Sequence, residues 1–467
     1  MSAALARGLG TLAGLAGLAL AGLAAAREAP PPLGTPQPFV VPAKSETQLD
    51  NGLKVTWVPF GSVPKTTLML VVATGNIDDG QKTGLADLSV ELMKQGAGAR
   101  DAQTLARYTA EMGGALEFAA GLEQSTLTLD VLEERAADAL TLIADVVRRP
   151  QLPVAQLPRL KADLARQSAI ARSQAQALAG EAYAKLLFGD SPYGREIPTD
   201  AEIASIGLAD VQAFAASQFG AARSHLYVGG RFDRAALERS LTAGFGDWAT
   251  GTAPARHPPE GAHRQQLRLI DRPGAAQSTI LMGLPAPGTA TPGFIQLSVA
   301  NVLFGGTLLS RLDQNLREDK GYAYGASSRL TPYSGFCAWT IATDVNAPDT
   351  DKALEQIYAE LARLRSEAPP ADELTRIQNY RAGTFVLGAS SRAGLLAQLA
   401  FIDQQGLPPD WLTSYVARLH AVTPEQVRAA ASRYLDPQAM TLVVVGDLKT
   451  IKPGILALPA LKDVRSE

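Results

Sequence analysis

The sequence is poor in cysteine and in charge. It has one cysteine, Cys337, in 467 residues, so an intrachain disulfide bond is excluded. Cys337 lies in an apolar run, GFCAWTIAT, which is typical of a core position and not of a reactive thiol. Charged residues make up 19% of the chain, and the net charge is −3. This composition gives no electrostatic basis for binding nucleic acid or an anionic membrane.

Histidine is also scarce, and the usual catalytic motifs are missing. No G-x-S-x-G elbow, P-loop or zinc-ribbon spacing occurs. The histidines are scattered and form no H-x-x-x-H pair: His225, His257, His263 and His420. Each is expected at the surface or in the core, because a histidine metal site would have to be assembled from distant positions.

An apolar run that approaches the ~20 residues of a membrane span is present only at the N-terminus. Leu9–Leu23 is a Leu/Ala/Gly run that follows Arg7, and Ala24-Ala25-Ala26 precedes Arg27. This pattern predicts that residues 1–26 are an export signal, with an uncleaved membrane anchor as the alternative. No cysteine follows the run, which excludes lipoprotein attachment. The expected location is the bacterial periplasm.

The remainder divides into two halves of similar length. Residues 27–44 are proline-rich and predict an extended tether. Residues 249–263 (ATGTAPARHPPEGAH) lack periodicity and predict a linker between domains at residues 45–248 and 264–467. Short-range patterns predict a hairpin turning at Asn51-Gly52, strands at Thr66–Thr74, Ala115–Ala120, Ser125–Val131 and His225–Val228, helices at Thr83–Lys94, Thr104–Met112, Glu134–Val147 and Ala209–Phe219, and a long helical region at Leu157–Leu187.

The two halves repeat one another. Thr66–Gly75 (TTLMLVVATG) resembles Thr279–Gly288 (TILMGLPAPG), and further landmarks recur in the same order at an offset of about 210 residues. These pairs are Gly96 with Gly306, Gly114 with Gly321, Asp130 with Asp344, Ala139 with Ala353, Val211 with Val427, and Val228 with Val445. We therefore predict an α+β fold made by tandem duplication, in which each unit is a largely antiparallel sheet covered by helices.

The stretch Thr83–Ala97 (TGLADLSVELMKQGA) carries the first family resemblance. Gly84-Leu85-Ala86 and Leu92-Met93-Lys94 resemble the flanks of the H-x-x-E-H zinc helix of the insulinase/pitrilysin metallopeptidases, the inverzincins. The motif positions themselves read Asp87-Leu88-Ser89-Val90-Glu91. Both histidines and the glutamate base are missing. The resemblance also implies a clamshell-type insulinase-like fold.

The same resemblance predicts that this chain holds no zinc. Asp87 and Glu91 keep the i, i+4 spacing, with Val90 at the glutamate position, but two carboxylates make a weak zinc site. The family's third ligand lies about 75 residues further on, near Arg166-Gln167. No acidic residue occurs between Leu164 and Gly180. Asp87 and Glu91 are either solvated helix carboxylates or a vestigial cation site.

The second half carries the other part of the resemblance. Leu303–Leu312 (LFGGTLLSRL) resembles the family's Gly-rich turn, and Leu316–Tyr324 (LREDKGYAY) matches its L-R-E-x-x-G-x-A-Y pattern. In the resembling enzymes the arginine and tyrosine hold the substrate backbone and stabilise the oxyanion. The resemblance thus implies catalytic roles for Arg317 and Tyr324. The alternative is an ordinary helix-surface arginine and a strand tyrosine.

Three hypotheses follow from these observations. The first is the zinc-less subunit of a two-chain peptidase that cleaves short unfolded peptides, with zinc, base and water supplied by a homologous partner bearing H-x-x-E-H. Its substrate-binding residues would be Gly305 and Gly306 together with Ala115, Leu116, Glu117 and Phe118, which hold an extended peptide. The second is an inactive structural or peptide-binding protein. The third is an independent peptidase that uses other residues.

Overall fold

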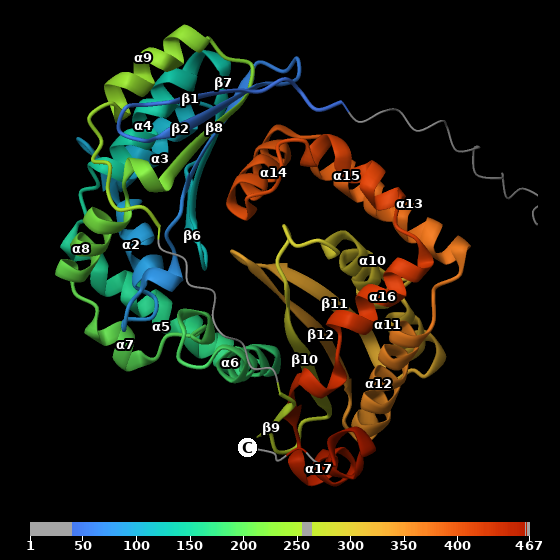
Figure 1. The fold of residues 1–467 in the computed structure, drawn as a ribbon. Helices are drawn as coiled ribbons and strands as arrows, with labels where there is room; N and C mark the ends of the chain where they lie inside the picture. The colour runs from blue at the N-terminus through green and yellow to red at the C-terminus, as the bar shows by residue number, and fades with distance from the viewer. Residues whose placement is uncertain (1–39, 255–263, 463, 465–467) are drawn as a thin grey trace, which may run out of the picture. The chain divides into compact units, whose positions relative to one another are not determined.

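The computed structural model describes residues 40–254, 264–462 and 464 (Figure 1). The expected export signal, most of the tether and most of the linker lie outside the described residues, as do His257 and His263. No single helix in the described part is long and apolar enough to cross a membrane. The helices Ala371–Gly388 and Arg392–Gln405 reach that length and hydropathy only when they are taken together, and the chain bends by 109° between them.

Two large sheets form the framework. A six-stranded sheet has the order β1-β2-β8-β3-β7-β6, and a five-stranded sheet has the order β11-β12-β10-β13-β9. Pairing is antiparallel except between β2 and β8 and between β13 and β9. The strands are β1 Ser45–Gln48, β2 Lys54–Pro59, β3 Lys65–Val72, β6 Glu117–Ala120, β7 Ser125–Leu132, β8 Ser224–Gly230, β9 Gln266–Asp271, β10 Gln277–Pro287, β11 Ala323–Pro332, β12 Phe336–Asn346 and β13 Thr441–Gly446, with a small ribbon of β4 Gly96–Ala97 and β5 Arg100–Asp101.

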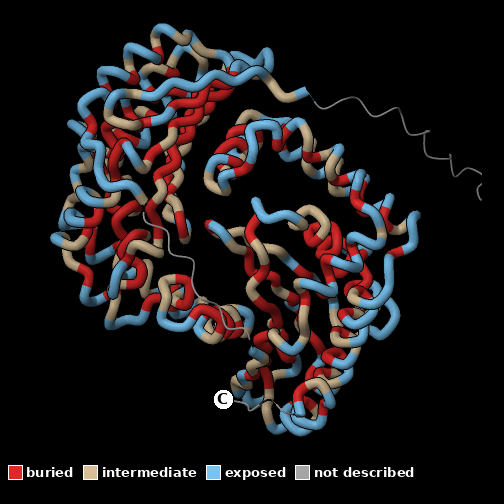
Figure 2. Tube along the Cα trace, in the orientation of Figure 1, coloured by how far each residue is buried: buried red, intermediate tan, exposed pale blue. Residues whose placement is uncertain are grey.

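Helices flank both sheets, and buried residues gather in the strands and on the helix faces turned to them (Figure 2). Along β7, Leu127, Leu129 and Val131 are fully buried while the residues between them are less so, which is the alternation of a strand with one face in the core. The helices are α2 Leu85–Met93, α3 Ala102–Glu111, α4 Ala136–Arg148, α5 Leu157–Ser173, α6 Ala175–Phe188, α7 Asp200–Ser205, α8 Leu208–Gln218, α9 Arg234–Phe245, α10 Phe294–Gly305, α11 Arg311–Asp313, α12 Thr350–Ser366, α13 Ala371–Gly388, α14 Arg392–Gln405, α15 Trp411–His420, α16 Pro424–Tyr434 and α17 Leu448–Ala457.

The predicted duplication is confirmed in the pairing of strands. β3 lies between β7 and β8, and β10 lies between β12 and β13. Thr67 donates a hydrogen bond to Asp130 on β7, and Thr279 donates the corresponding bond to Asp344 on β12. Ala139 and Ala353 lie on the matching helices α4 and α12, and Val211 and Val427 lie on α8 and α16. The α+β prediction and the largely antiparallel sheets are therefore correct.

The long helical region predicted at Leu157–Leu187 is two helices. The chain is extended at Gln174, with φ −98° and ψ 133°, between α5 and α6. After this break α6 packs against β10 and β13 of the second sheet, where Tyr183 and Leu187 share a buried cluster with Val443 and Val445. Periodicity in the sequence does not reveal the break, because both helices are apolar on the faces they bury.

Helix α14 makes the reciprocal crossing. It packs against β8 and β3 of the first sheet, where a Cβ at Gly229 would lie 3.0 Å from Leu396. Arg392 Nη2 donates to Asp130 Oδ1 over 3.0 Å, and on the other crossing Gln176 Nε2 donates to Asp344 Oδ2 over 2.7 Å. Each sheet is thus contacted by a helix from the other half of the sequence.

A histidine lies beneath the crossing of α14. His225 Nε2 is 2.8 Å from Thr56 Oγ1, and its Nδ1 is 3.0 Å from Tyr227 Oη. Tyr227 donates to Asp403 on α14 over 2.6 Å. Burial lowers the pKa of His225 to about 4, and nearby Lys54 and Lys44 act in the same direction, whereas Asp403 and Glu46 oppose them.

The lowered pKa of His225 predicts that acid destabilises the folded chain. Because the folded pKa lies below the unfolded value of 6.5, the unfolded chain binds the proton first as pH falls. Stability should therefore drop as pH falls from 6.5 towards 4, by at most about 3 kcal/mol. Urea unfolding of His225→Gln should show a smaller loss between pH 7 and pH 4.5 than the unaltered chain. The exposed His420→Gln is the control, and equal losses in all three proteins would contradict the prediction.

Candidate functional site

Helix α2, which carries the altered zinc motif, starts at a buried carboxylate. Its N-cap, Gly84, has no side chain and a φ of +90°. Asp79 lies 5% exposed and accepts hydrogen bonds from the backbone N–H groups of Gly84 and Ala86, each over 2.7 Å. Burial raises the pKa of Asp79 to about 7, and the two backbone donors oppose this rise. Asp79 thus supplies the helix cap that the glycine lacks.

A cavity of about 380 Å³ lies between α2 and α5. Asp87 and Glu91 line it from α2, and Gln167 lines it from α5. The position expected for the third zinc ligand is therefore beside the first two, but it carries an amide. Asp163, one helical turn before Gln167, also lines the cavity. It was not predicted, because it lies just before Leu164–Gly180, the stretch around the position expected for the third ligand.

The residues of this cavity do not fit zinc. Asp87 accepts a hydrogen bond from Asn76 over 2.9 Å, and Glu91 pairs with Lys94 over 2.6 Å. Within the described residues, no group of three or more His, Cys, Asp or Glu side chains is placed to hold a metal ion. A catalytic zinc takes three protein ligands, and carboxylates with no imidazole or thiolate suit other cations better. Asp87 is half-buried, and burial raises the pKa of its carboxyl.

Arg317 and Tyr324 lie side by side. The guanidinium carbon of Arg317 is 5.2 Å from the centroid of the Tyr324 ring, and Nε forms an ion pair with Glu318 over 3.3 Å. The Tyr324 residue is 87% exposed, and the Arg317 side chain is 36% exposed. Both donors are therefore accessible to a ligand or a second chain.

Two backbone irregularities place this pair. Arg317 lies in the π-helical segment η6, Gln314–Asp319. Tyr324 lies in a β-bulge between two paired positions, Ala323–Val345 and Ala326–Thr343. Between these pairs β11 has one residue more than β12. The buried Asp313 accepts a hydrogen bond from the N–H of Ala326 over 3.1 Å. Both kinds of irregularity are frequent at functional sites.

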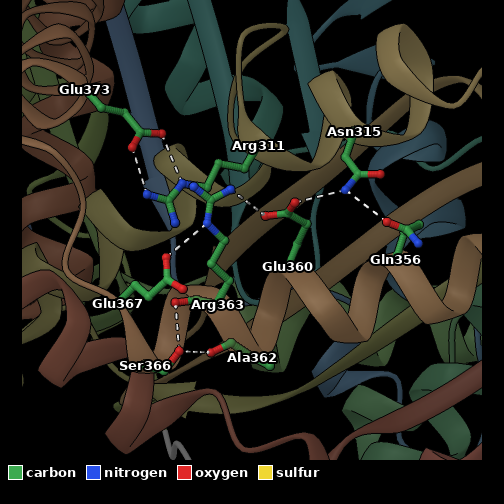
Figure 3. A network of polar contacts seen from close by, with 9 residues as sticks. All are labelled: Arg311, Asn315, Gln356, Glu360, Ala362, Arg363, Ser366, Glu367 and Glu373. Atoms are coloured by element: carbon green, nitrogen blue, oxygen red, sulfur yellow. Dashed lines mark hydrogen bonds and ion pairs between the residues drawn. The ribbon is translucent and has the colours of Figure 1, made fainter.

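Side chains anchor the helical turns before Arg317, as Figure 3 shows. Arg311 on α11 makes a two-point ion pair with Glu373 on α13, with Nε and Nη2 at 3.0 and 2.7 Å from the carboxylate. Asn315 on η6 donates to Gln356 and Glu360 on α12, over 3.2 and 2.9 Å. The segment that carries Arg317 is therefore tied to two long helices.

Gly305 and Gly306, predicted to bind substrate, have a packing role in the structure. Gly305 is buried at the end of α10, where a Cβ would lie 2.5 Å from the backbone nitrogen of Ser328 on β11. At Gly306 a Cβ would lie 2.7 Å from Val302 Cα. These close approaches explain why both positions are glycine. Contact of either residue with substrate stays a prediction.

The predicted strand Ala115–Ala120 starts later, at Glu117, so Ala115 and Leu116 precede β6. Among the described strands, β6 pairs only with β7, so one edge of it is open to an extended peptide. Phe118 is 3% exposed and packs edge-on against Phe219. Phe118 is therefore a core residue. Contact of substrate with the exposed Ala115 and Glu117, and with the half-buried Leu116, stays a prediction.

Comparison with known families assigns both halves. Residues 61–200 match the family described as Insulinase (Peptidase family M16), and residues 205–380 match the Peptidase M16 inactive domain. The chain belongs to peptidase family M16. The first match covers the Asp87–Gln167 cavity, and the inactive-domain match covers Arg317 and Tyr324.

Relatives of this M16 chain include proteins described as uncharacterized zinc proteases. One from Mycobacterium leprae is 23% identical over 84% of this chain and 89% of its own length. YmxG of Bacillus subtilis is 21% identical over 84% of this chain and 96% of its own length. The family resemblance predicted from the sequence is confirmed.

Solved structures share the fold. A peptidase M16 inactive domain from Pseudomonas fluorescens has a TM-score of 0.81 at 24% identity, covering 86% of this chain and 98% of that one. A protease from Helicobacter pylori also reaches 0.81, at 16% identity, covering 87% of this chain and 100% of that one. At these identities the likeness concerns the fold alone.

Proposed function

We propose that this M16 chain is the zinc-less subunit of a two-chain peptidase that cleaves short, unfolded peptides. The observation that supports this proposal is the contrast between the α2–α5 cavity and the Arg317–Tyr324 pair. The α2–α5 cavity lacks zinc ligands, whereas Arg317 and Tyr324 are intact, adjacent and exposed. A pair of exposed donors is useful when reacting groups come from another chain.

The partner in this proposal is a homologous chain bearing H-x-x-E-H, which supplies the zinc, the metal-bound water and the glutamate base. Arg317 and Tyr324 act in trans on the bound peptide. The guanidinium and the phenol together hold the substrate backbone and donate to the oxygen that gains negative charge. The open edge of β6 pairs with the extended peptide. The pattern of the N-terminal segment supports a periplasmic location for the two-chain complex.

A peptidase assay with zinc analysis tests the proposal. The purified chain alone should be inert on quenched peptides and hold no stoichiometric zinc. The complex recovered with its native partner should cleave peptides and hold about one zinc per pair, because one chain of the two has the three ligands. Activity and zinc in the chain alone would overturn the proposal. Absence of both from the complex would instead favour the inactive binding or structural protein.

A further inference from the structure

A separate open cavity of about 460 Å³ lies in the second half, lined by residues of α10, β11, α13, α14 and α15. None of its lining residues belongs to the α2–α5 cavity, to the Arg317–Tyr324 pair or to β6. Its volume is in the range of cavities that take a small ligand or a single large side chain. The function proposed above makes no use of it.

Aromatic side chains are concentrated in the wall of this cavity. Only 6% of the residues in the chain are aromatic, yet five line this one cavity: Phe294, Phe385, Phe401, Trp411 and Tyr415. Tyr415 packs between two of the others, with ring centroids 4.4 Å from Phe385 and 5.7 Å from Trp411. Such a wall favours a flat or bulky apolar group.

One cation interrupts the aromatic lining. Arg381 on α13 lines the cavity and donates from Nη2 to Tyr415 Oη over 3.1 Å. Its Nε is buried and has no acceptor within the described residues. Among the described residues, no carboxylate oxygen lies within 4.0 Å of a guanidinium nitrogen of Arg381. The guanidinium charge thus has no carboxylate partner among the described residues, and a ligand carboxylate would pair with the part of it that lines the cavity.

The lining also indicates which kind of carboxylate fits. It contains no aspartate or glutamate, so nothing there pairs with the ammonium group of a free amino acid. A peptide's last residue has a carboxylate but no ammonium. We propose that this cavity binds the C-terminal residue of a peptide that ends in a large apolar side chain. The carboxylate pairs with Arg381, and the side chain packs against Phe401 and Trp411.

This inference rests on the proposed function only in taking peptides as ligands, and it is tested without the partner chain. The probe is an acetylated hexapeptide ending in phenylalanine, titrated into the purified chain by calorimetry. Three comparison ligands isolate the chemistry: the same peptide with a C-terminal amide, the same peptide ending in glycine, and free phenylalanine. Each should bind at least tenfold more weakly, because each loses the charge pair, loses the apolar group or adds an unpaired ammonium.

Two variants test whether the peptide carboxylate binds at Arg381. Arg381→Gln should weaken binding of the acid peptide at least tenfold and should make acid and amide bind alike. Arg376→Gln, an exposed arginine on the same helix, should leave binding unchanged. Equal affinity for acid and amide in the unaltered chain overturns the proposal even if Arg381→Gln fails to fold. Binding of free phenylalanine as tight as the peptide, or no binding at all, overturns it as well. Loss of peptidase activity in the complex has no bearing on these readouts.

Discussion

Arg317→Ala is expected to lower kcat/KM of the two-chain complex by about 10²–10³-fold, the usual cost of removing one donor that stabilises transition-state charge. The loss should fall mainly on kcat, because the donor interacts most strongly with the charge that develops during the reaction. Arg317 is partly exposed; its ion pair with Glu318 and its contact with the exposed Tyr324 ring are both at the surface, so the fold should be unaffected. Steady-state kinetics on a quenched peptide measures the effect, and sedimentation shows that the chains still associate.

Two further variants make this result specific. Tyr324→Phe keeps the ring and removes the hydroxyl donor, so it should also lower kcat while leaving assembly unchanged. Arg329→Ala removes an exposed arginine on the same strand as Tyr324 and should leave kinetics within twofold, since surface substitutions have little effect. If Arg317→Ala and Arg329→Ala behave alike, Arg317 has no catalytic role.

The second large effect concerns stability. Arg311→Ala is expected to lower the free energy of unfolding by about 3 kcal/mol, because it leaves the carboxylate of Glu373 without its partner in a poorly solvated place. The Arg311 side chain is 7% exposed and that of Glu373 is 19% exposed. Urea denaturation measures the change. The ion pair is drawn in Figure 3.

The control for this prediction is an ion pair exposed on both sides. Arg107 pairs with Glu111 over 3.9 Å, and their side chains are 68% and 58% exposed. Arg107→Ala should change stability by less than about 1 kcal/mol, since water already screens that pair. The double variant Arg311→Met, Glu373→Leu should regain most of the loss, because no buried charge is left unpaired. A loss in the double variant as large as in Arg311→Ala would show that packing, and not charge, explains the effect.

Several features could be predicted from the sequence because they depend on local order. Strand alternation, the Asn51-Gly52 turn and the landmark series that ends at Val228 and Val445 identified a duplicated α+β fold. The altered motif at Asp87 and Glu91 followed from residue identity alone, as did the match at Arg317 and Tyr324. Motif spacing is a property of the chain and needs no coordinates.

The tertiary structure alone decided how these parts meet. The break at Gln174 and the crossings of α6 and α14 depend on contacts between residues far apart in sequence, which periodicity does not encode. The same holds for Asp163 beside Glu91 and for Arg381 among aromatic rings from other helices. The π-helical segment and the bulge that bring Arg317 to Tyr324 each depend on a shifted hydrogen-bond register. A register is set by packing of whole elements, so it appears only in the folded chain.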